Sequence, residues 1–269
     1  MEKSLSLVGM KKLIVNTIRK LGYDIVKYGD VPHSVRNKKL SFYSTKTGNY
    51  FLPTDAINDE IAAAIKNNQI FDKEIVEWAS KFIRPKTSVL DIGSNFGQMS
   101  VLFSKLLNGK GRVYSFEADD WVYKILLKNI KANGKNGVII PHFGAVHNKN
   151  NKTLFFPVQD FKKYQSYGSF GIDYIARRGR KVKSLTIDGL KIKEQISFMK
   201  IDIEGGDLKA MEGARKTIKK NKMPIIFEFQ GIYQDKYNMH FQDYIDFVED
   251  INYKFSRVIN EINFLILPK

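Results

Sequence analysis

Residues 88–97 read Ser-Val-Leu-Asp-Ile-Gly-Ser-Asn-Phe-Gly, and Glu117 ends the next apolar run, which begins at Arg112. The first run predicts a short buried strand over 88–92, the glycines predict a turn, and a helix is expected over 97–107. In a strand–helix–strand unit of this kind, the turn and the acid meet at the carboxyl edge of a parallel sheet. The segment therefore predicts an α/β fold with backbone amides beside a carboxylate, and a nucleoside with ribose hydroxyls fits such an edge.

The turn also restricts the cofactor. Dinucleotide-binding turns read Gly-x-Gly-x-x-Gly, and the middle glycine lets the backbone approach a pyrophosphate. Here Asn95 lies near that position, and Asp91, two residues before Gly93, would repel a phosphate but attract an ammonium or a sulfonium group. S-adenosylmethionine carries both cations and no phosphate, so we expect it as the cofactor. The alternative is an ordinary strand–turn–helix with a polar turn.

The composition sets outer limits. The chain has 269 residues, of which 43% are hydrophobic, enough for one large domain or for a core with an appendage. Cysteine is absent, which excludes disulfides and thiolate sites and fits a reducing compartment, so we expect a cytoplasmic location. No apolar run approaches the ~20 residues that a membrane span needs.

The formal net charge is +16, which suggests an anionic partner such as a nucleic acid, a phospholipid or an acidic glycan. The many Lys and Asn residues fit a compositional bias instead, and we favour that explanation for the overall charge. The densest basic stretch is 177–183, Arg-Arg-Gly-Arg-Lys-Val-Lys. Because arginine grips phosphates and carboxylates through paired hydrogen bonds, we expect this stretch to flank the entrance for a small anionic acceptor and not for a long nucleic acid.

The chain divides into an N-terminal extension over 1–87 and an α/β domain over 88–269. In the extension, helices are expected over 5–21, 55–66 and 72–82, and a hairpin over 39–43 and 49–52. In the domain, the expected strands are 88–92, 112–118, 138–141 continuing toward 145–146, 196–203 and 224–229. The expected helices are 97–107, 120–132, 206–219 and 241–251, and a hairpin over 253–267 ends the chain. An irregular insertion over 147–183, rich in aromatic residues and glycine, indicates a lid or another functional loop.

The chain resembles FkbM-family methyltransferases. The matching segments are 89–97, 111–118, 185–190 and 198–205 (Phe-Met-Lys-Ile-Asp-Ile-Glu-Gly), followed by 213–214 and 226–228. The resemblance covers about 88–230 and leaves 1–87 uncovered. Two departures are Ala118, where proline is usual, and Gly206-Asp207, where the family has Ala/Pro-Glu. Neither removes a group that the cofactor needs.

This resemblance implies a Rossmann-like class I methyltransferase fold, with a mostly parallel seven-stranded sheet, helices on both faces and an antiparallel closing strand. It also implies S-adenosyl-L-methionine as the methyl donor and O-methylation of a sugar or related hydroxyl in a natural product or surface glycan. We expect the cofactor to contact residues of the turn and of the strand ends: Asp91, Gly93, Ser94, Asn95, Gly97, Glu117, Ala118, Ala145, Val146 and Asp202. Within this set, Glu117 binds the ribose hydroxyls, and Ala145 and Val146 pack on adenine.

Four acids lie near strand ends: Asp202, Glu204, Glu228 and Asp188. Of these, Asp202, Glu204 and Glu228 are candidates for activating the acceptor, and His147 is another. A sugar hydroxyl is a poor nucleophile, so a general base should accelerate its attack by ~10²–10⁴. Asp202 is the first choice; the alternative is that it caps helix 206–219. Glu228 lies between Phe227 and Phe229, which would raise its pKa by desolvation, unless it is a buried structural acid. His147 is a lone loop histidine, which is more often solvated.

Several alternatives remain open from the sequence. The aromatic residues over 164–170 either close over the acceptor or simply pack the insertion. No metal is expected, although Asp202, Glu228 and Gln230 could imitate the Mg²⁺ site of catechol-type methyltransferases. The basic charge supports an RNA ribose methyltransferase as the second enzyme reading. A binding module that has lost catalysis is the third reading, and the intact acids and glycines argue against it.

Overall fold

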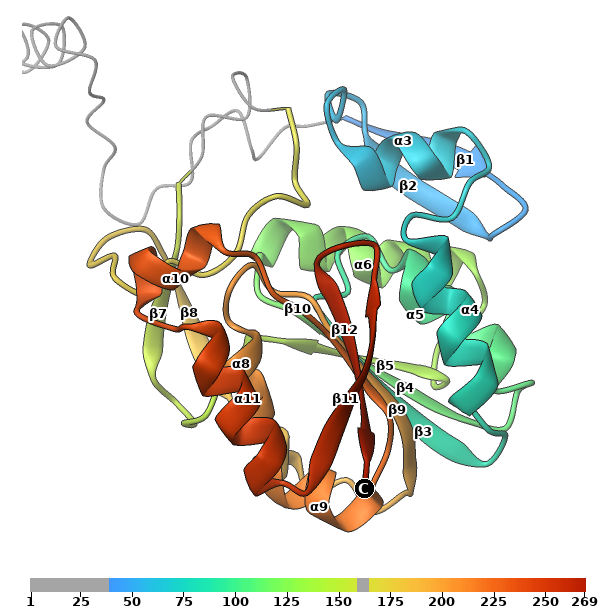
Figure 1. The fold of residues 1–269 in the computed structure, drawn as a ribbon. Coiled ribbons are helices and arrows are strands. Elements are labelled where there is room, and N and C mark those ends of the chain that lie inside the picture. Colours follow the sequence, from blue (N-terminus) through green and yellow to red (C-terminus); the bar gives the residue numbers. More distant parts are fainter. Residues whose placement is uncertain (1–38, 159–164) are drawn as a thin grey trace, which may run out of the picture.

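The computed structural model describes residues 39–158 and 165–269 (Figure 1). The helix expected over 5–21 lies outside these residues. In the part of the extension that is described, β1 (Leu40–Ser44) and β2 (Asn49–Pro53) form the expected antiparallel hairpin. They are followed by α3 (Glu60–Lys66) and α4 (Lys73–Phe82). Asp59 begins α3 by accepting a hydrogen bond from the Ala62 amide, as N-cap aspartates do.

A seven-stranded sheet forms the centre of the molecule, in the order β11-β12-β10-β9-β3-β4-β5. Its strands are β3 (Thr87–Ile92), β4 (Gly111–Glu117), β5 (Ile139–Phe143), β9 (Ile196–Ile201), β10 (Ile225–Glu228), β11 (Tyr253–Ile259) and β12 (Asn263–Pro268). β12 runs antiparallel to both of its neighbours, whereas the pairs from β10 to β5 are parallel. The chain leaves β3 toward β4 on one side and later returns to β9 on the other. The carboxyl ends of β3 and β9 therefore form the switch point where α/β proteins bind ligands.

Helices cover both faces of this sheet (Figure 1). α4, α5 (Gln98–Leu106) and α6 (Asp120–Ala132) pack on one face, and α8 (Asp207–Glu212), α9 (Arg215–Asn221) and α11 (Phe241–Asp250) on the other. Successive strand residues point to opposite faces, so Val89 joins the first core and Leu90 the second. Because both faces are covered, β9 reads Ile-Ser-Phe-Met-Lys-Ile with every residue buried.

The N-terminal hairpin is tied to α6 by asparagine side chains. The Asn129 side chain accepts from the Phe51 amide at 2.6 Å and donates to the Phe51 carbonyl at 3.2 Å. Asn133 makes the same pair of bonds with Asn49, at 2.9 and 2.7 Å. Each asparagine thus replaces a missing strand partner along the edge of β2. The described part of the extension is consequently anchored to α6.

The structure corrects two expectations within the domain. The insertion 147–183 is not wholly irregular: β7 (Thr153–Phe156) and β8 (Arg180–Leu185) join β6 (Ala145–Val146) in a three-stranded sheet. The single helix expected over 206–219 is two helices, α8 and α9, which break at Gly213. A Cβ on Gly213 would lie 2.0 Å from the His147 carbonyl oxygen, so only glycine fits at the position where the two helices meet.

Asp188 illustrates a strand-end acid with a structural role. It starts a short 3₁₀ helix (Asp188–Leu190), and its carboxylate accepts from the backbone amides of Lys216 and Thr217 at 3.0 and 2.8 Å. These amides belong to the first turn of α9, where the helix leaves its own donors without partners. Asp188 therefore caps α9 from a distance and is occupied by that contact.

One further helix, α10 (Ile232–Tyr237), was not expected from the sequence. Over residues 39–158 and 165–269, no helix combines the length and the apolar character needed to cross a membrane.

Candidate active site

A cleft with about 950 Å³ of empty space, part of it open to solvent, lies at the carboxyl edge of the sheet. Its walls come from the turn after β3, the ends of β4 and β9, β6, the insertion and the N-terminal extension. Of the ten residues expected to contact the cofactor, eight line the cleft: Gly93, Ser94, Asn95, Glu117, Ala118, Ala145, Val146 and Asp202.

The glycine turn is shaped by the close approach of two strands. Gly93 has φ 83°, and a Cβ on it would lie 1.8 Å from the Asp202 carbonyl oxygen. Only glycine fits there, because both the backbone angle and the contact exclude a side chain. Asn95 also has a left-handed backbone, with φ 48°. The turn therefore brings the backbone after β3 against the backbone after β9 at the switch point.

Glu117 is held by backbone amides. Its Oε2 accepts from the Asn95 amide at 2.9 Å, and its Oε1 accepts from the amides of Ala118 and Asp119 at 2.7 and 2.8 Å. Burial raises the pKa of this carboxyl to about 7, although the amide hydrogen bonds oppose the rise. The carboxylate is thus fixed in place and keeps acceptor capacity for ribose hydroxyls.

Asp91 and Gly97 do not line the cleft. Asp91 is fully buried and accepts a hydrogen bond from the Ser100 hydroxyl, which is also hydrogen-bonded to the Ser115 hydroxyl at 2.5 Å. Gly97 begins α5 with φ 89°. The structure therefore gives both residues a role in holding the turn and the start of α5, and it shows no direct path from either to a ligand in the cleft.

The end of β9 carries a buried ion pair that the sequence analysis did not single out. Lys200 is 4% exposed, and its ammonium lies 3.0 Å from Asp202 Oδ2 and donates to the Gly93 carbonyl at 3.1 Å. Burial disfavours its charge, but the carboxylates of Asp202 and Asp91 outweigh burial and raise its pKa. The sequence could have indicated this pair, because a lysine inside an otherwise apolar buried strand needs a partner of opposite charge. Lys200 links the glycine turn to Asp202.

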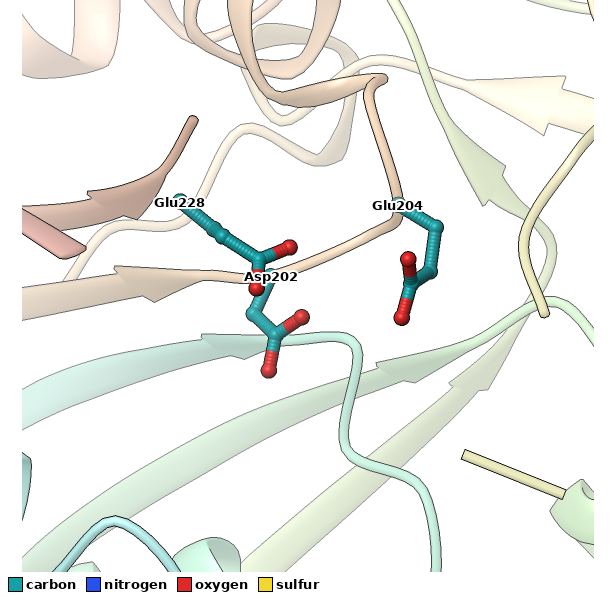
Figure 2. A group of neighbouring side chains, drawn as sticks. All are labelled: Asp202, Glu204 and Glu228. Carbon is teal, nitrogen blue, oxygen red and sulfur yellow. The ribbon is translucent and has the colours of Figure 1, made fainter. Parts of the chain in front are cut away.

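Three carboxyl groups cluster where β9 and β10 end: Asp202, Glu204 and Glu228 (Figure 2). Asp202 and Glu204 line the cleft, and Glu228 lies behind them, 8% exposed. Burial raises the pKa of Glu204 to about 7 and that of Glu228 to about 9, and the negative charge of Asp202 adds to both shifts. Glu204 also has a left-handed backbone, with φ 57°, a strain typical of functional sites.

The surroundings of this cluster add a fourth acid and one hydroxyl. Asp207 is fully buried, accepts from the Glu228 amide at 3.1 Å, and has a pKa that burial raises to about 8. The Tyr233 hydroxyl donates to Glu204 Oε2 at 2.5 Å. The region is therefore rich in carboxyl groups that repel one another.

His147, a candidate base, lies outside the cleft lining. It is 2% exposed, and its Nδ1 accepts from the Lys149 amide at 3.2 Å. Burial, together with the charges of nearby lysines, lowers its pKa to about 4. A buried neutral imidazole that does not face the ligand space is not placed to take a proton from an acceptor there, so the structure argues against this candidate.

Residues 167–174 of the insertion form one wall of the cleft, which we call the roof. Hydrogen bonds join it to the N-terminal extension. The aromatic residues Tyr167, Phe170 and Tyr174 line it, whereas Tyr164 lies outside the described residues. Asp59 Oδ2 accepts from the amides of Tyr167 and Gly168 at 2.7 and 3.1 Å. The Tyr167 hydroxyl donates to Asp55 at 2.8 Å. Two acids of the extension thus hold the insertion over the ligand space.

The extension also contributes lining residues that the sequence analysis missed: Ile61, Phe71 and Asp72. Asp72 has φ 48° and does not cap α4, and burial together with the charge of Asp202 raises its pKa to about 6. The sequence offered no signal for these residues, because an aspartate before a helix is typical of a cap. Only the packing of the extension brings them to the cleft.

In the basic stretch 177–183, Arg180 is already bound to acidic side chains of the protein itself. The Arg180 guanidinium makes a fork with Asp119, at 2.6 and 2.9 Å, and also bonds Asp120 at 2.6 Å. It lies over the Phe156 ring, 4.7 Å from its centre. The expectation that Arg180 grips an acceptor is therefore not supported, since its hydrogen-bonding edge ties β8 to the start of α6. Arg177 and Arg178 are exposed.

The sequence model of the methyltransferase FkbM domain matches residues 91–255. A search of curated proteins found no match.

Among solved structures, methyltransferase FkbM from Methylobacillus flagellatus KT is 17% identical, with a TM-score of 0.46. The match covers 71% of this chain and 49% of that one, so this chain spans about half its length. TYW2 of M. jannaschii, in complex with AdoMet, is 14% identical, with a TM-score of 0.45 and coverage of 86% and 84%. Aeropyrum pernix fibrillarin, with natively bound S-adenosyl-L-methionine, is 14% identical, with a TM-score of 0.39 and coverage of 89% and 86%.

The match to the family model spans more than half of the chain and includes the glycine turn, Glu117 and the Lys-Ile-Asp-Ile-Glu-Gly segment. The seven-stranded sheet with its antiparallel strand is the sheet that the family resemblance implied. The chain belongs to the FkbM family of S-adenosylmethionine-dependent methyltransferases.

Proposed function

We propose that the protein transfers the methyl group of S-adenosylmethionine to a hydroxyl of a sugar or glycan-related acceptor. The observation that carries the proposal is that Asp202 and Glu204 line the same cleft as the glycine turn and Glu117. A methyl donor held by the turn and by Glu117 would have carboxylates beside it. A hydroxyl needs to lose its proton as it attacks, and a carboxylate within hydrogen-bond reach is the group that can take it.

In this reaction the main task of the site is to align the acceptor with the methyl donor. The acceptor oxygen, the methyl carbon and the sulfur have to lie in line, and holding them there supplies much of the rate. Lys200 holds Asp202 by an ion pair at 3.0 Å, and the Tyr233 hydroxyl holds Glu204. Both carboxylates are therefore oriented before an acceptor arrives. In this scheme Asp202 orients the acceptor, and either Asp202 or Glu204 takes its proton.

The roof suits a sugar. Tyr167 and Phe170 present aromatic rings to the cleft, and the apolar face of a sugar ring packs on such rings. Outside, Arg177 and Arg178 are exposed on the segment before β8 and would contact an anionic group of the acceptor, such as a phosphate or a carboxylate. An acceptor with a neutral sugar inside and an anionic group at the rim fits both features.

The test is product analysis. The full chain is incubated with S-adenosylmethionine carrying an isotopically labelled methyl group and with sugar nucleotides, acidic glycans, RNA and DNA, and the products are analysed by mass spectrometry. We expect a labelled O-methyl group on a sugar hydroxyl of a small acceptor, with affinity that falls slightly with salt and drops in Arg178→Ala. Methylated RNA, bound with the steep salt dependence of a multi-phosphate contact, would replace this proposal with an RNA methyltransferase.

A further inference from the structure

The three carboxyl groups at the ends of β9 and β10 have the arrangement of a ligand set. One oxygen from each of Asp202, Glu204 and Glu228 lies within 4.8 Å of the other two (Figure 2). Asp202 and Glu204 reach the group from the segment after β9, and Glu228 reaches it from the last position of β10. The oxygens therefore face a common space at the floor of the cleft.

Glu228 supplies a second observation that points to a ligand in this space. The residue is 8% exposed, and its Oε2 has no hydrogen-bond partner. Figure 2 shows its carboxyl group turned toward Asp202, not away from the cluster. A buried carboxylate oxygen without a partner costs free energy, and the loss is larger when the nearest groups are also acids. A cation among the three would remove that cost.

Two neighbours orient the group without filling the space. The Lys200 ammonium contacts Asp202 Oδ2, and the Tyr233 hydroxyl bonds Glu204 Oε2. Each contact fixes one oxygen of its carboxylate, as outer partners commonly do for metal-binding side chains. The Lys200 ammonium also donates to the Gly93 carbonyl, so it is drawn toward the glycine turn.

The spacing suits a hard divalent ion. Ca²⁺ binds carboxylate oxygens at about 2.3–2.6 Å and Mg²⁺ at about 2.0–2.1 Å, so oxygens on opposite sides of the ion are about 4.6–5.2 or 4.0–4.2 Å apart. The three oxygens all lie within 4.8 Å of one another, close enough to share one ion of this kind. We propose that Asp202, Glu204 and Glu228 bind one divalent cation, of the Mg²⁺, Mn²⁺ or Ca²⁺ class, at the floor of the cleft.

This site differs from the metal alternative that the sequence offered, because Glu204 takes part and Gln230 is not needed. The cation would be reached through the cleft, where Asp202 and Glu204 are partly exposed. Its remaining coordination positions would accept an oxygen of the acceptor and polarise it. Because a carboxylate bound to a cation is a weaker base, this polarisation would supply part of the activation that the proposed function assigns to Asp202 or Glu204. That role rests on the proposed function, whereas the binding site itself does not.

The experiment measures binding directly. The purified full chain is treated with EDTA, desalted, and titrated with Mn²⁺ at slightly alkaline pH, and free Mn²⁺ is followed by electron paramagnetic resonance. We expect one Mn²⁺ per chain, displaced by Mg²⁺ and Ca²⁺. Glu228→Gln should weaken binding by at least about tenfold. Glu77→Gln changes an exposed glutamate of α4 in the same way and should leave binding unchanged.

Folding is checked in each variant by circular dichroism and by binding of S-adenosylhomocysteine; if Glu228→Gln fails to fold, Glu204→Gln takes its place. Absence of stoichiometric Mn²⁺ binding up to millimolar concentration would overturn the site. Equal Mn²⁺ affinity in Glu228→Gln and the wild type would also overturn it, by showing that the ion is bound elsewhere. If Mn²⁺ binds as expected but no hydroxyl is methylated, the proposed function fails and the cation site stands.

Discussion

Glu117 and Glu228 occupy the same local position, the last residue of a parallel strand, yet their surroundings are opposite. Glu117 accepts three backbone amides, two of them from the residues that lead into α6. Glu228 faces Asp202 and Glu204 and has an oxygen without a partner. After β4 the chain folds back so that the amides of Ala118 and Asp119 reach Glu117. After β9, the parallel neighbour of β10, the chain instead carries the acids Asp202 and Glu204.

The comparison teaches that an acid at a strand end acquires its role from what packs around it. On the β4 side, backbone amides complete the carboxylate and leave it ready to accept neutral hydroxyl donors. On the β9–β10 side, carboxylates repel one another and favour a bound proton or cation. We call the glycine turn with Glu117 the cofactor half of the site, and Asp202, Glu204 and Glu228 the acceptor half. The cofactor half is therefore organised before a ligand binds, whereas the arrangement of the acceptor half depends on what binds.

The largest effect on stability is expected at Gly93, where the backbone of the cofactor half contacts the backbone at Asp202. Gly93→Ala would place a Cβ 1.8 Å from the Asp202 carbonyl oxygen, at a backbone angle of 83° that alanine disfavours. The unfolding free energy should fall by more than about 3 kcal/mol, because strain and steric overlap add. Gly109→Ala is the control, since Gly109 has φ 70° but nothing within 4 Å of a Cβ, and it should cost about 1 kcal/mol. Denaturant unfolding of both variants measures the difference; equal losses would mean that the contact yields easily.

Asp202→Asn is expected to act on the acceptor half alone. Turnover should fall by ~10²-fold or more, because the amide cannot take a proton. The affinity for S-adenosylhomocysteine, measured by calorimetry, should change little. A large loss of affinity would instead assign Asp202 to the cofactor half, and near-normal turnover would move the base to Glu204 or Glu228.

The roof offers a test of how the extension supports the acceptor half. Asp59 is buried and accepts three amides, one from Ala62 in α3 and two from Tyr167 and Gly168. In Asp59→Asn an NH₂ group would face an N–H donor, and the loss should be about 2 kcal/mol of unfolding free energy, with a raised KM for the acceptor. Asn58→Ala removes an exposed 3.4 Å contact at the same seam and should have little effect. An unchanged KM in Asp59→Asn would show that the roof does not shape the acceptor site.

The smallest effect concerns pH and Glu117. Its carboxyl has a pKa raised by burial from 4.5 to about 7, and ribose hydroxyls donate to the ionised form, so cofactor affinity should fall as pH drops below 7, by up to about tenfold per unit. In the ligand-free protein, the folded state keeps a proton that the unfolded chain releases above 4.5, so this group lowers stability as pH rises from 4.5 to about 7.

Calorimetry with S-adenosylhomocysteine across this range measures the affinity. Glu117→Gln, which cannot titrate, serves as the control for the other acids of the cleft. It should bind more weakly at every pH and lose the part of the slope that belongs to Glu117. A wild-type slope retained in the variant would assign the titration to Asp72 or Glu204.

The sequence by itself determined the α/β class and the order of the seven strands of the central sheet. It also determined the glycine turn beside Glu117. These features depend on local signals: apolar runs of strand length, glycines at a tight turn and an acid at a strand end. The fold and the family were predicted correctly for that reason, and most of the expected cofactor residues line the cleft.

Tertiary structure alone decided which acids face a ligand and which are structural. In the sequence, Asp91 and Asp188 look as available for ligand binding as Glu117 and Asp202. In the structure, Asp91 is buried and hydrogen-bonded by Ser100, and Asp188 caps α9. The break at Gly213, the pairing of Arg180 with Asp119 and the arrival of Asp72 at the cleft also depend on segments far apart in the chain. A residue's type fixes what it can bind, whereas its burial and its partners, which only packing supplies, fix what it does bind.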